Sequence, residues 1–159
     1  IKIWFIAMIN QLFTGKPNSI MLCLIGRQNS GKTYWLRHLL YEEARINHYS
    51  ENEIADDKDF KILSGHMWLI VDDELTSKSK IDQKAFKKLV TSNGAFIRPP
   101  YGRVAEKIRR TASFAATGNE VSILRDVTGN RRMLFIKVDS IDHGLYNSVD
   151  KEKLFIEMY

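Results

Sequence analysis

The stretch Ser19-Ile-Met-Leu-Cys-Leu-Ile-Gly-Arg-Gln-Asn-Ser-Gly-Lys-Thr33 decides the fold predicted for this chain. Up to Ile25 it is a continuous apolar run without alternation, which is typical of a strand covered on both faces. From Gly26 onward it matches the pattern G-x-x-x-x-G-K-[ST] in full. Residues 34–47 then place their apolar side chains at helical spacing. A buried strand, a glycine-rich turn and a helix in this order predict a loop that binds phosphate groups.

Each residue type in the loop suits that chemistry. Gly26 and Gly31 allow the backbone to curl, so that successive N–H groups face a β-phosphate at the start of the following helix. Lys32 supplies a mobile positive charge to the β- and γ-phosphates, and the Thr33 hydroxyl is the expected ligand for Mg²⁺. The residues predicted to contact ATP are Gly26, Arg27, Gln28, Asn29, Ser30, Gly31, Lys32 and Thr33. An incidental glycine-rich turn is the alternative interpretation, which the flanking strand and helix disfavour.

A second apolar run, Met67-Trp-Leu-Ile-Val71, ends in three acidic residues. A phosphate-binding loop needs a carboxylate at the end of a neighbouring strand to hold hydrated Mg²⁺, and a second carboxylate to polarise water. We predict that Asp72 or Asp73 is the metal-side acid and that Glu74 is the general base. Consecutive residues that leave a strand alternate in direction, so only one aspartate can face the nucleotide, and the sequence leaves that choice open. A surface acidic turn is the alternative interpretation.

The rest of the pattern predicts a three-layer α/β domain with a mainly parallel sheet, because strands alternate with helices along the chain. Further strands are predicted at residues 60–63, 111–117 and 133–138, helices at 3–13, 81–90 and 153–158, a surface loop at 42–59, and a protruding hairpin or loop at 95–103. From length and composition we expect a single domain, residues 1–159. Because the chain begins with Ile1 rather than Met, we expect that it comes from a longer protein.

The composition excludes several classes of protein. Of the 159 residues, 44% are hydrophobic and 27% charged, so the chain can fill one core and is not intrinsically disordered. The lone Cys23 excludes an internal disulfide, and one thiol with four histidines excludes a Cys-rich structural zinc site. We expect a reducing, cytoplasmic compartment and an inert, buried Cys23. The apolar opening meets Asn10 and Gln11 too soon to span a bilayer, so we expect an N-terminal helix within residues 1–14 and no membrane partner.

The net charge of +5 is concentrated in one segment. Between residues 98 and 132 the chain has eight Lys or Arg residues against three Asp or Glu residues, which accounts for the whole net charge. This concentration predicts a polyanion nearby, either nucleic acid or the phosphates of a bound nucleotide. A solvated basic face is the alternative interpretation.

Several of these features together resemble a known family. They are GRQNSGKT, the apolar run into DDE, RPPYGR, RTASFAATGNE and LRDVTGNRR, and they extend from Gly26 to about Asp139. The combination resembles the virulence-associated protein E group of phage and mobile-element proteins, whose ATPase domain is similar to superfamily 3 helicases within the AAA+-like P-loop class. The resemblance implies a three-layer P-loop NTPase with a mainly parallel central sheet of about five strands.

The resemblance also implies roles for individual residues. Asn119 would be the polar sensor at the end of the strand between the phosphate-loop strand and the acidic strand, where it orients the attacking water, since an amide both donates and accepts. A turn asparagine after Gly118 is the alternative. Arg131 or Arg132 would be the arginine finger that reaches a neighbouring subunit's nucleotide, unless it forms a salt bridge or is merely solvated. The residues expected to contact DNA in a pore are Lys87, Lys88, Arg98, Tyr101 and Arg103, with an ordinary basic hairpin as the alternative.

These expectations combine into one functional hypothesis. The chain is expected to hydrolyse ATP with Mg²⁺ and to act as the helicase or motor domain of a phage or mobile-element replication protein. It would work on DNA, single-stranded in a ring pore, as a homo-oligomer such as a hexamer. An ATP-dependent DNA-binding switch without unwinding is the alternative, followed by a P-loop small-molecule kinase. No lid with acceptor-binding residues is evident for the kinase.

Overall fold

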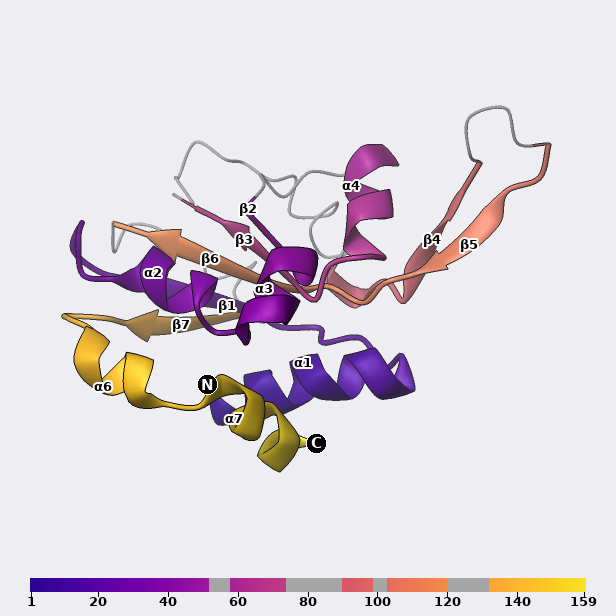
Figure 1. Cartoon of the computed structure of the whole chain (residues 1–159). Helices are drawn as coiled ribbons and strands as arrows, with labels where there is room; N and C mark the ends of the chain where they lie inside the picture. The colour runs from indigo at the N-terminus through magenta and orange to yellow at the C-terminus, as the bar shows by residue number, and fades with distance from the viewer. Residues whose placement is uncertain (52–57, 74–89, 99–102, 120–131) are drawn as a thin grey trace.

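Five parallel strands form the central sheet of the molecule (Figure 1). The computed structural model describes residues 1–51, 58–73, 90–98, 103–119 and 132–159. The order across the sheet is β2 (Tyr49–Glu51), β3 (Leu69–Asp72), β6 (Ser113–Gly118), β1 (Met21–Ile25) and β7 (Met133–Lys137). Every neighbouring pair runs parallel. The prediction of an α/β fold with a parallel sheet of five strands is therefore confirmed.

Alternate residues of β1 enter two different cores. Leu22 and Leu24 pack with residues of the helices on one face of the sheet, whereas Met21, Cys23 and Ile25 pack on the other. This division follows from the period of two in a strand, and it explains why the apolar run shows no polar alternation. All residues of β1, β3 and β6 are buried for the same reason.

Among the described residues, more helices pack on one face of the sheet than on the other. The first face carries α1 (Lys2–Thr14), α2 (Lys32–Arg37), α3 (Glu42–His48) and α7 (Lys151–Met158), whose apolar residues join the core that contains Leu22 and Leu24. The second face carries α4 (Lys58–Ser64) through Phe60, together with Val90. The short helix α6 (His143–Ser148) follows β7. None of the helices in the described ranges is long and apolar enough to cross a membrane.

The predicted N-terminal helix is confirmed as α1, and buried polar groups fasten it to the sheet. The Gln11 amide donates to the carbonyl oxygens of Arg110 (3.2 Å) and Ala112 (3.0 Å), just before β6, and accepts from the backbone N–H of Asn18 at 2.6 Å. The Arg109 guanidinium donates to the carbonyls of Gln11 and Leu12, near the end of α1. The buried Gln11 side chain is thus hydrogen-bonded through both its amide nitrogen and its amide oxygen.

A separate two-stranded hairpin projects from the sheet (Figure 1). Its strands β4 (Gly94–Ile97) and β5 (Glu106–Arg109) are antiparallel, and the Arg110 N–H donates to the Asn93 carbonyl at its base. The predicted hairpin is confirmed for its described residues. It leaves the sheet where β6 begins.

Three local predictions were wrong. Residues 60–63 belong to α4 and not to a strand, because a short apolar run has no period that separates the two. The helix predicted over 34–47 is two short helices, since α2 ends at Arg37 and the intervening turn buries both Leu39 and Leu40 in the same core. The surface loop predicted at 42–59 begins with α3 and β2. In α3, acidic residues in the first turn and basic residues in the last complement the helix dipole.

One arginine of the basic segment, Arg110, is buried rather than exposed. Arg110 is 2% exposed, stacks its guanidinium 5.0 Å from the centre of the Phe114 ring, and donates to the carbonyls of Asn18 and Val90. Burial lowers the pKa of Arg110 to about 10. Arg110 therefore joins secondary-structure elements, and its charge is not available to an external polyanion. Arg98, Arg103 and Lys107 are exposed on the hairpin.

Candidate functional site

The glycine-rich loop connects β1 to α2 and is organised around its own lysine. The Lys32 amine donates to the carbonyls of Gly26 (3.0 Å) and Arg27 (2.6 Å) and to the Ser30 hydroxyl (3.2 Å). Lys32 is 5% exposed. Burial lowers the pKa of its ammonium, and the nearby Asp73 charge opposes that shift. A buried cation surrounded by loop oxygens places positive charge at the base of the loop before any ligand binds.

Backbone strain and crowding explain the loop's glycines. Gly31 has φ +89°, in the left-handed region, and Asn29 also has a positive φ of 61°. Gly26 does not have a positive φ, but a β-carbon there would lie 2.0 Å from the Val138 carbonyl oxygen. Val138 follows β7 and is bonded to Ile25 through its backbone, so it has little room to move.

We expect Gly26→Ala to lower the free energy of unfolding by about 1–3 kcal/mol, the usual cost of an overpacked site. Gly144→Ala in α6 is the matched control, because its β-carbon would meet only the Asp142 side chain at an ordinary 3.4 Å. Urea unfolding of both variants measures the difference. Equal midpoints for the two variants would contradict the steric explanation.

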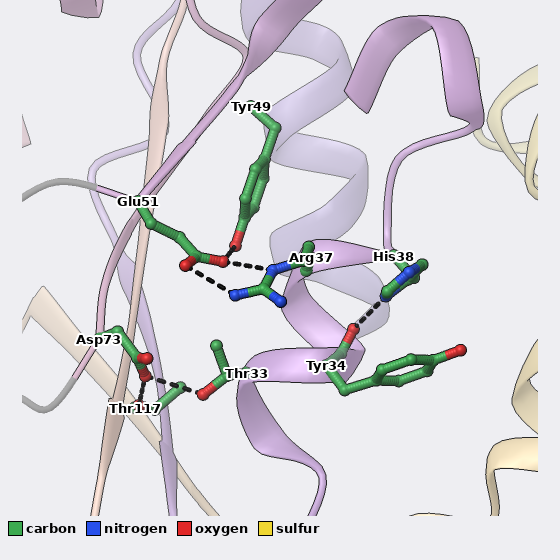
Figure 2. A network of polar contacts seen from close by, with 8 residues as sticks. All are labelled: Thr33, Tyr34, Arg37, His38, Tyr49, Glu51, Asp73 and Thr117. Carbon is green, nitrogen blue, oxygen red and sulfur yellow. Dashed lines mark hydrogen bonds and ion pairs between the residues drawn. The ribbon is translucent and has the colours of Figure 1, made fainter. Parts of the chain in front are cut away.

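The structure gives different surroundings to Asp72 and Asp73, between which the sequence could not choose. Asp73 lies just past β3, and its Oδ1 accepts hydrogen bonds from the hydroxyls of Thr33 (2.7 Å) and Thr117 (2.6 Å), as Figure 2 shows. Asp72, the last residue of β3, is buried. Burial of the Cys23 thiol raises its pKa to about 12, and the negative charge of Asp72 is the second cause of this rise. Asp73 thus faces the loop, whereas Asp72 lies on the side of Cys23, which is buried as predicted.

These groups surround a pocket of about 390 Å³ at the carboxyl ends of β1, β3 and β6. Its lining comprises Gln28, Asn29, Ser30, Gly31, Lys32, Thr33, Tyr34, Asp73, Thr117, Asn119 and His143. Asn119 follows β6, the strand between β1 and β3, so this part of its predicted placement is confirmed. Gly26 and Arg27 are not lining residues, and they contribute carbonyl oxygens to Lys32 instead.

Sequence reasoning missed three lining residues: Tyr34, Thr117 and His143. Tyr34 directly follows the motif, and Thr117 precedes Gly118 in a strand already expected to end at the site, so both had a signal in the sequence. His143 had none, because it is more than a hundred residues from the loop and reaches it only through the pairing of β7 with β1.

A charged network holds α2 against the edge strand β2 (Figure 2). The Arg37 guanidinium donates to both oxygens of Glu51 (2.7 and 2.8 Å), and the Tyr49 hydroxyl donates to the same carboxylate at 2.6 Å. The hydrogen bond from Arg37 is the main cause that lowers the pKa of Glu51. Because the pair is partly exposed, it contributes about 1 kcal/mol at most to stability. The network therefore fixes the position of α2, the helix that begins at Lys32.

Other predicted residues lie away from the pocket. Arg132 immediately precedes β7, whose first residue pairs with the first residue of β1. It is therefore about 16 Å, the length of a five-residue strand, from the end of β1 that carries the loop. Arg98 follows β4 and Arg103 precedes β5 in the hairpin, which projects from the end of the sheet opposite the loop (Figure 1). Glu74, Lys87, Lys88, Tyr101 and Arg131 lie outside the described residues.

The family model of the virulence-associated protein E-like domain matches residues 1–159. The chain belongs to this family. No curated protein sequence matches this virulence-associated protein E-like domain.

Solved structures show the same fold. Two apo structures of the NrS-1 C-terminal region match this virulence-associated protein E-like domain with TM-scores of 0.60 and 0.59, at 15% and 17% sequence identity. Each match covers 98% of this chain but only 37% and 40% of the solved chains. The domain therefore spans about two fifths of the length of these neighbours, and at such identities the likeness concerns the fold.

Proposed function

We propose that the chain is a P-loop ATPase domain that binds ATP with Mg²⁺ in the pocket above β1. One observation carries the proposal: the Lys32 amine, the Thr33 hydroxyl and the Asp73 carboxylate meet at a glycine-rich loop on the carboxyl edge of a parallel sheet. Ligands of open α/β sheets bind at this edge, and a buried ammonium beside backbone turns suits a polyphosphate.

The donor set also fits magnesium. Thr33 Oγ1 and Asp73 Oδ1 are 2.7 Å apart, and hydroxyl and carboxylate oxygens are the hard ligands that Mg²⁺ shares with phosphates. When bound, Mg²⁺ would neutralise charge on the phosphate oxygens. Lys32 would bind the β- and γ-phosphates, and Asn119 would orient water against the γ-phosphate. Glu74, next to Asp73 in the chain, would accept the proton of that water.

The position of Arg132 supports an assembly of several copies. Because it lies at the other end of β7 from the phosphate loop, Arg132 is remote from the pocket of its own chain. We infer that it, or Arg131, stabilises transition-state charge at the nucleotide of a neighbouring copy. A ring such as a hexamer would place each arginine at the next copy's pocket.

The hairpin supports DNA as the substrate of the motor. Arg98, Arg103 and Lys107 are exposed on it, and Phe96 presents an exposed ring that can stack on a base. The strand β6 directly follows the hairpin and leads to Thr117 and Asn119, so the proposed DNA element and the pocket lie at the two ends of one strand. Membership of the family supports a role in replication.

The activity is tested by ATP turnover with and without single-stranded DNA, followed by a strand-displacement assay. DNA-stimulated turnover that drives displacement is the result expected for a motor. ATP-promoted DNA binding without displacement would favour the switch. Transfer of phosphate to a small acceptor, with no response to DNA, would contradict both.

The DNA-binding role of the hairpin has its own test. We expect the double variant Arg98→Gln/Arg103→Gln to weaken single-stranded DNA binding and to reduce the salt slope of log K by about 1.4, which is roughly 0.7 for each DNA phosphate that the variant no longer neutralises. Lys2→Gln/Lys153→Gln removes the same charge from exposed sites on α1 and α7 and should leave the slope unchanged. Fluorescence anisotropy over a range of salt concentrations measures both. Equal slopes in the two variants would remove the hairpin from the DNA interface.

A further inference from the structure

His143 has no role in the proposed phosphate chemistry, and its side chain lies against one side of the loop. His143 begins α6, and its Nε2 lies 3.0 Å from the position of a β-carbon built on Gly31. In the strand order, β7 and α6 are on one side of β1, whereas β6 and β3 are on the other. His143 and Asp73 therefore lie on opposite sides of the loop.

Tyr34, His38 and His143 form a wall of aromatic rings on this side of the pocket. Its ring meets His143 edge to face, with centroids 4.5 Å apart and planes at 83°, and stacks on His38 at 4.1 Å. Tyr34 and His143 both line the loop pocket, and Tyr34 and His38 also line an adjoining pocket of about 480 Å³. In Figure 2, Tyr34 points away from Thr33 on the side opposite Asp73.

Hydrogen bonds hold this wall in place. The Tyr34 hydroxyl donates to the Asn147 side chain at 3.1 Å, and the Tyr146 hydroxyl donates to the Trp35 carbonyl at 2.7 Å. Both bonds connect α6 to α2. The rings are thus positioned by the fold before a ligand binds, which reduces the entropy lost on binding.

We propose that Tyr34 and His143 form the nucleoside subsite of the pocket, so that the chain binds a nucleoside triphosphate by its base as well as by its phosphates. This inference rests on the proposed function. A triphosphate that lies along the loop with its γ-phosphate toward Asp73 and Asn119 directs its nucleoside to the other side, where the two rings are. Stacking on aromatic rings stabilises a base, whereas a triphosphate without a base gains nothing there.

The other explanation of these rings is that they only pack α6 onto α2. The two explanations differ in what they predict for a ligand without a base. If the rings only pack, replacing the exposed His143 changes thermal stability but affects ATP and inorganic tripolyphosphate alike. A nucleoside subsite changes the affinity for ATP alone.

The test is equilibrium dialysis of ATP and of inorganic tripolyphosphate, each with Mg²⁺, against the whole chain and its variants. We expect His143→Ala to weaken ATP binding about tenfold and to leave tripolyphosphate unchanged, and His143→Phe, which retains a ring, to bind ATP within about twofold of the unaltered chain. Lys32→Ala should weaken the binding of both ligands, because both contact the phosphate loop.

The outcomes distinguish this inference from the proposed function. An equal loss of both ligands in His143→Ala, or no loss of either, would overturn the nucleoside subsite while leaving the ATPase intact. Failure of the unaltered chain to bind either ligand would overturn the ATPase itself. Circular dichroism of His143→Ala checks that the fold is retained.

Discussion

Replacing Lys32 with alanine is expected to reduce ATP turnover about 10²- to 10³-fold, the usual effect of removing one preorganised charge from a transition state. The amine is already buried at the base of the loop, next to the proposed phosphate site. Its loss also leaves the carbonyls of Gly26 and Arg27 without their shared donor. Turnover at saturating ATP and equilibrium ATP binding, measured side by side, check the prediction.

One further variant separates charge from shape at position 32, and a second is a control on a distant helix. Lys32→Arg keeps the charge, but a planar guanidinium cannot replace a compact ammonium among three close acceptors, so turnover should remain low. Lys153→Ala removes an exposed lysine from α7 and should behave as the unaltered chain does. Urea unfolding confirms that each variant is folded. Normal turnover in Lys32→Ala would remove the phosphate loop from the mechanism.

The sequence predicted the parts of the site that are close together in the chain. The loop from Gly26 to Thr33 could be recognised because spacing along the backbone fixes how its groups converge. The buried strands could be recognised because strands covered on both faces lack polar alternation. In contrast, α4 and the turn after Arg37 depend on which core their apolar side chains enter, which is a tertiary property.

The parts that sequence could not predict depend on pairing between distant strands. We propose Asp73 rather than Asp72 as the metal-side acid because Thr33 and Thr117 donate to Asp73, and these contacts form only once β1, β3 and β6 lie side by side. The burial of Arg110 could not be predicted from the sequence either. Its sequence context indicates a basic surface, but its position before β6 buries it against Phe114.

The assignment of the metal-side acid gives the second large expected effect. Asp73→Asn should lower turnover about 100-fold and shift its dependence on Mg²⁺ to higher concentration, because the amide lacks the charge that holds the ion. An asparagine retains an oxygen that accepts from Thr33 and Thr117, so the fold should be unaffected.

Asp72→Asn is the matched control for this assignment, since it removes the same charge one residue earlier. Asp72 is buried beside Cys23 and does not line the pocket, so its replacement should leave the Mg²⁺ dependence of turnover unchanged, whatever its effect on stability. A Mg²⁺ titration of turnover in both variants decides between the two residues. If Asp72→Asn shifted the titration and Asp73→Asn did not, the metal-side acid would be Asp72. The hydrogen bonds of Asp73 to Thr33 and Thr117 would then be only structural.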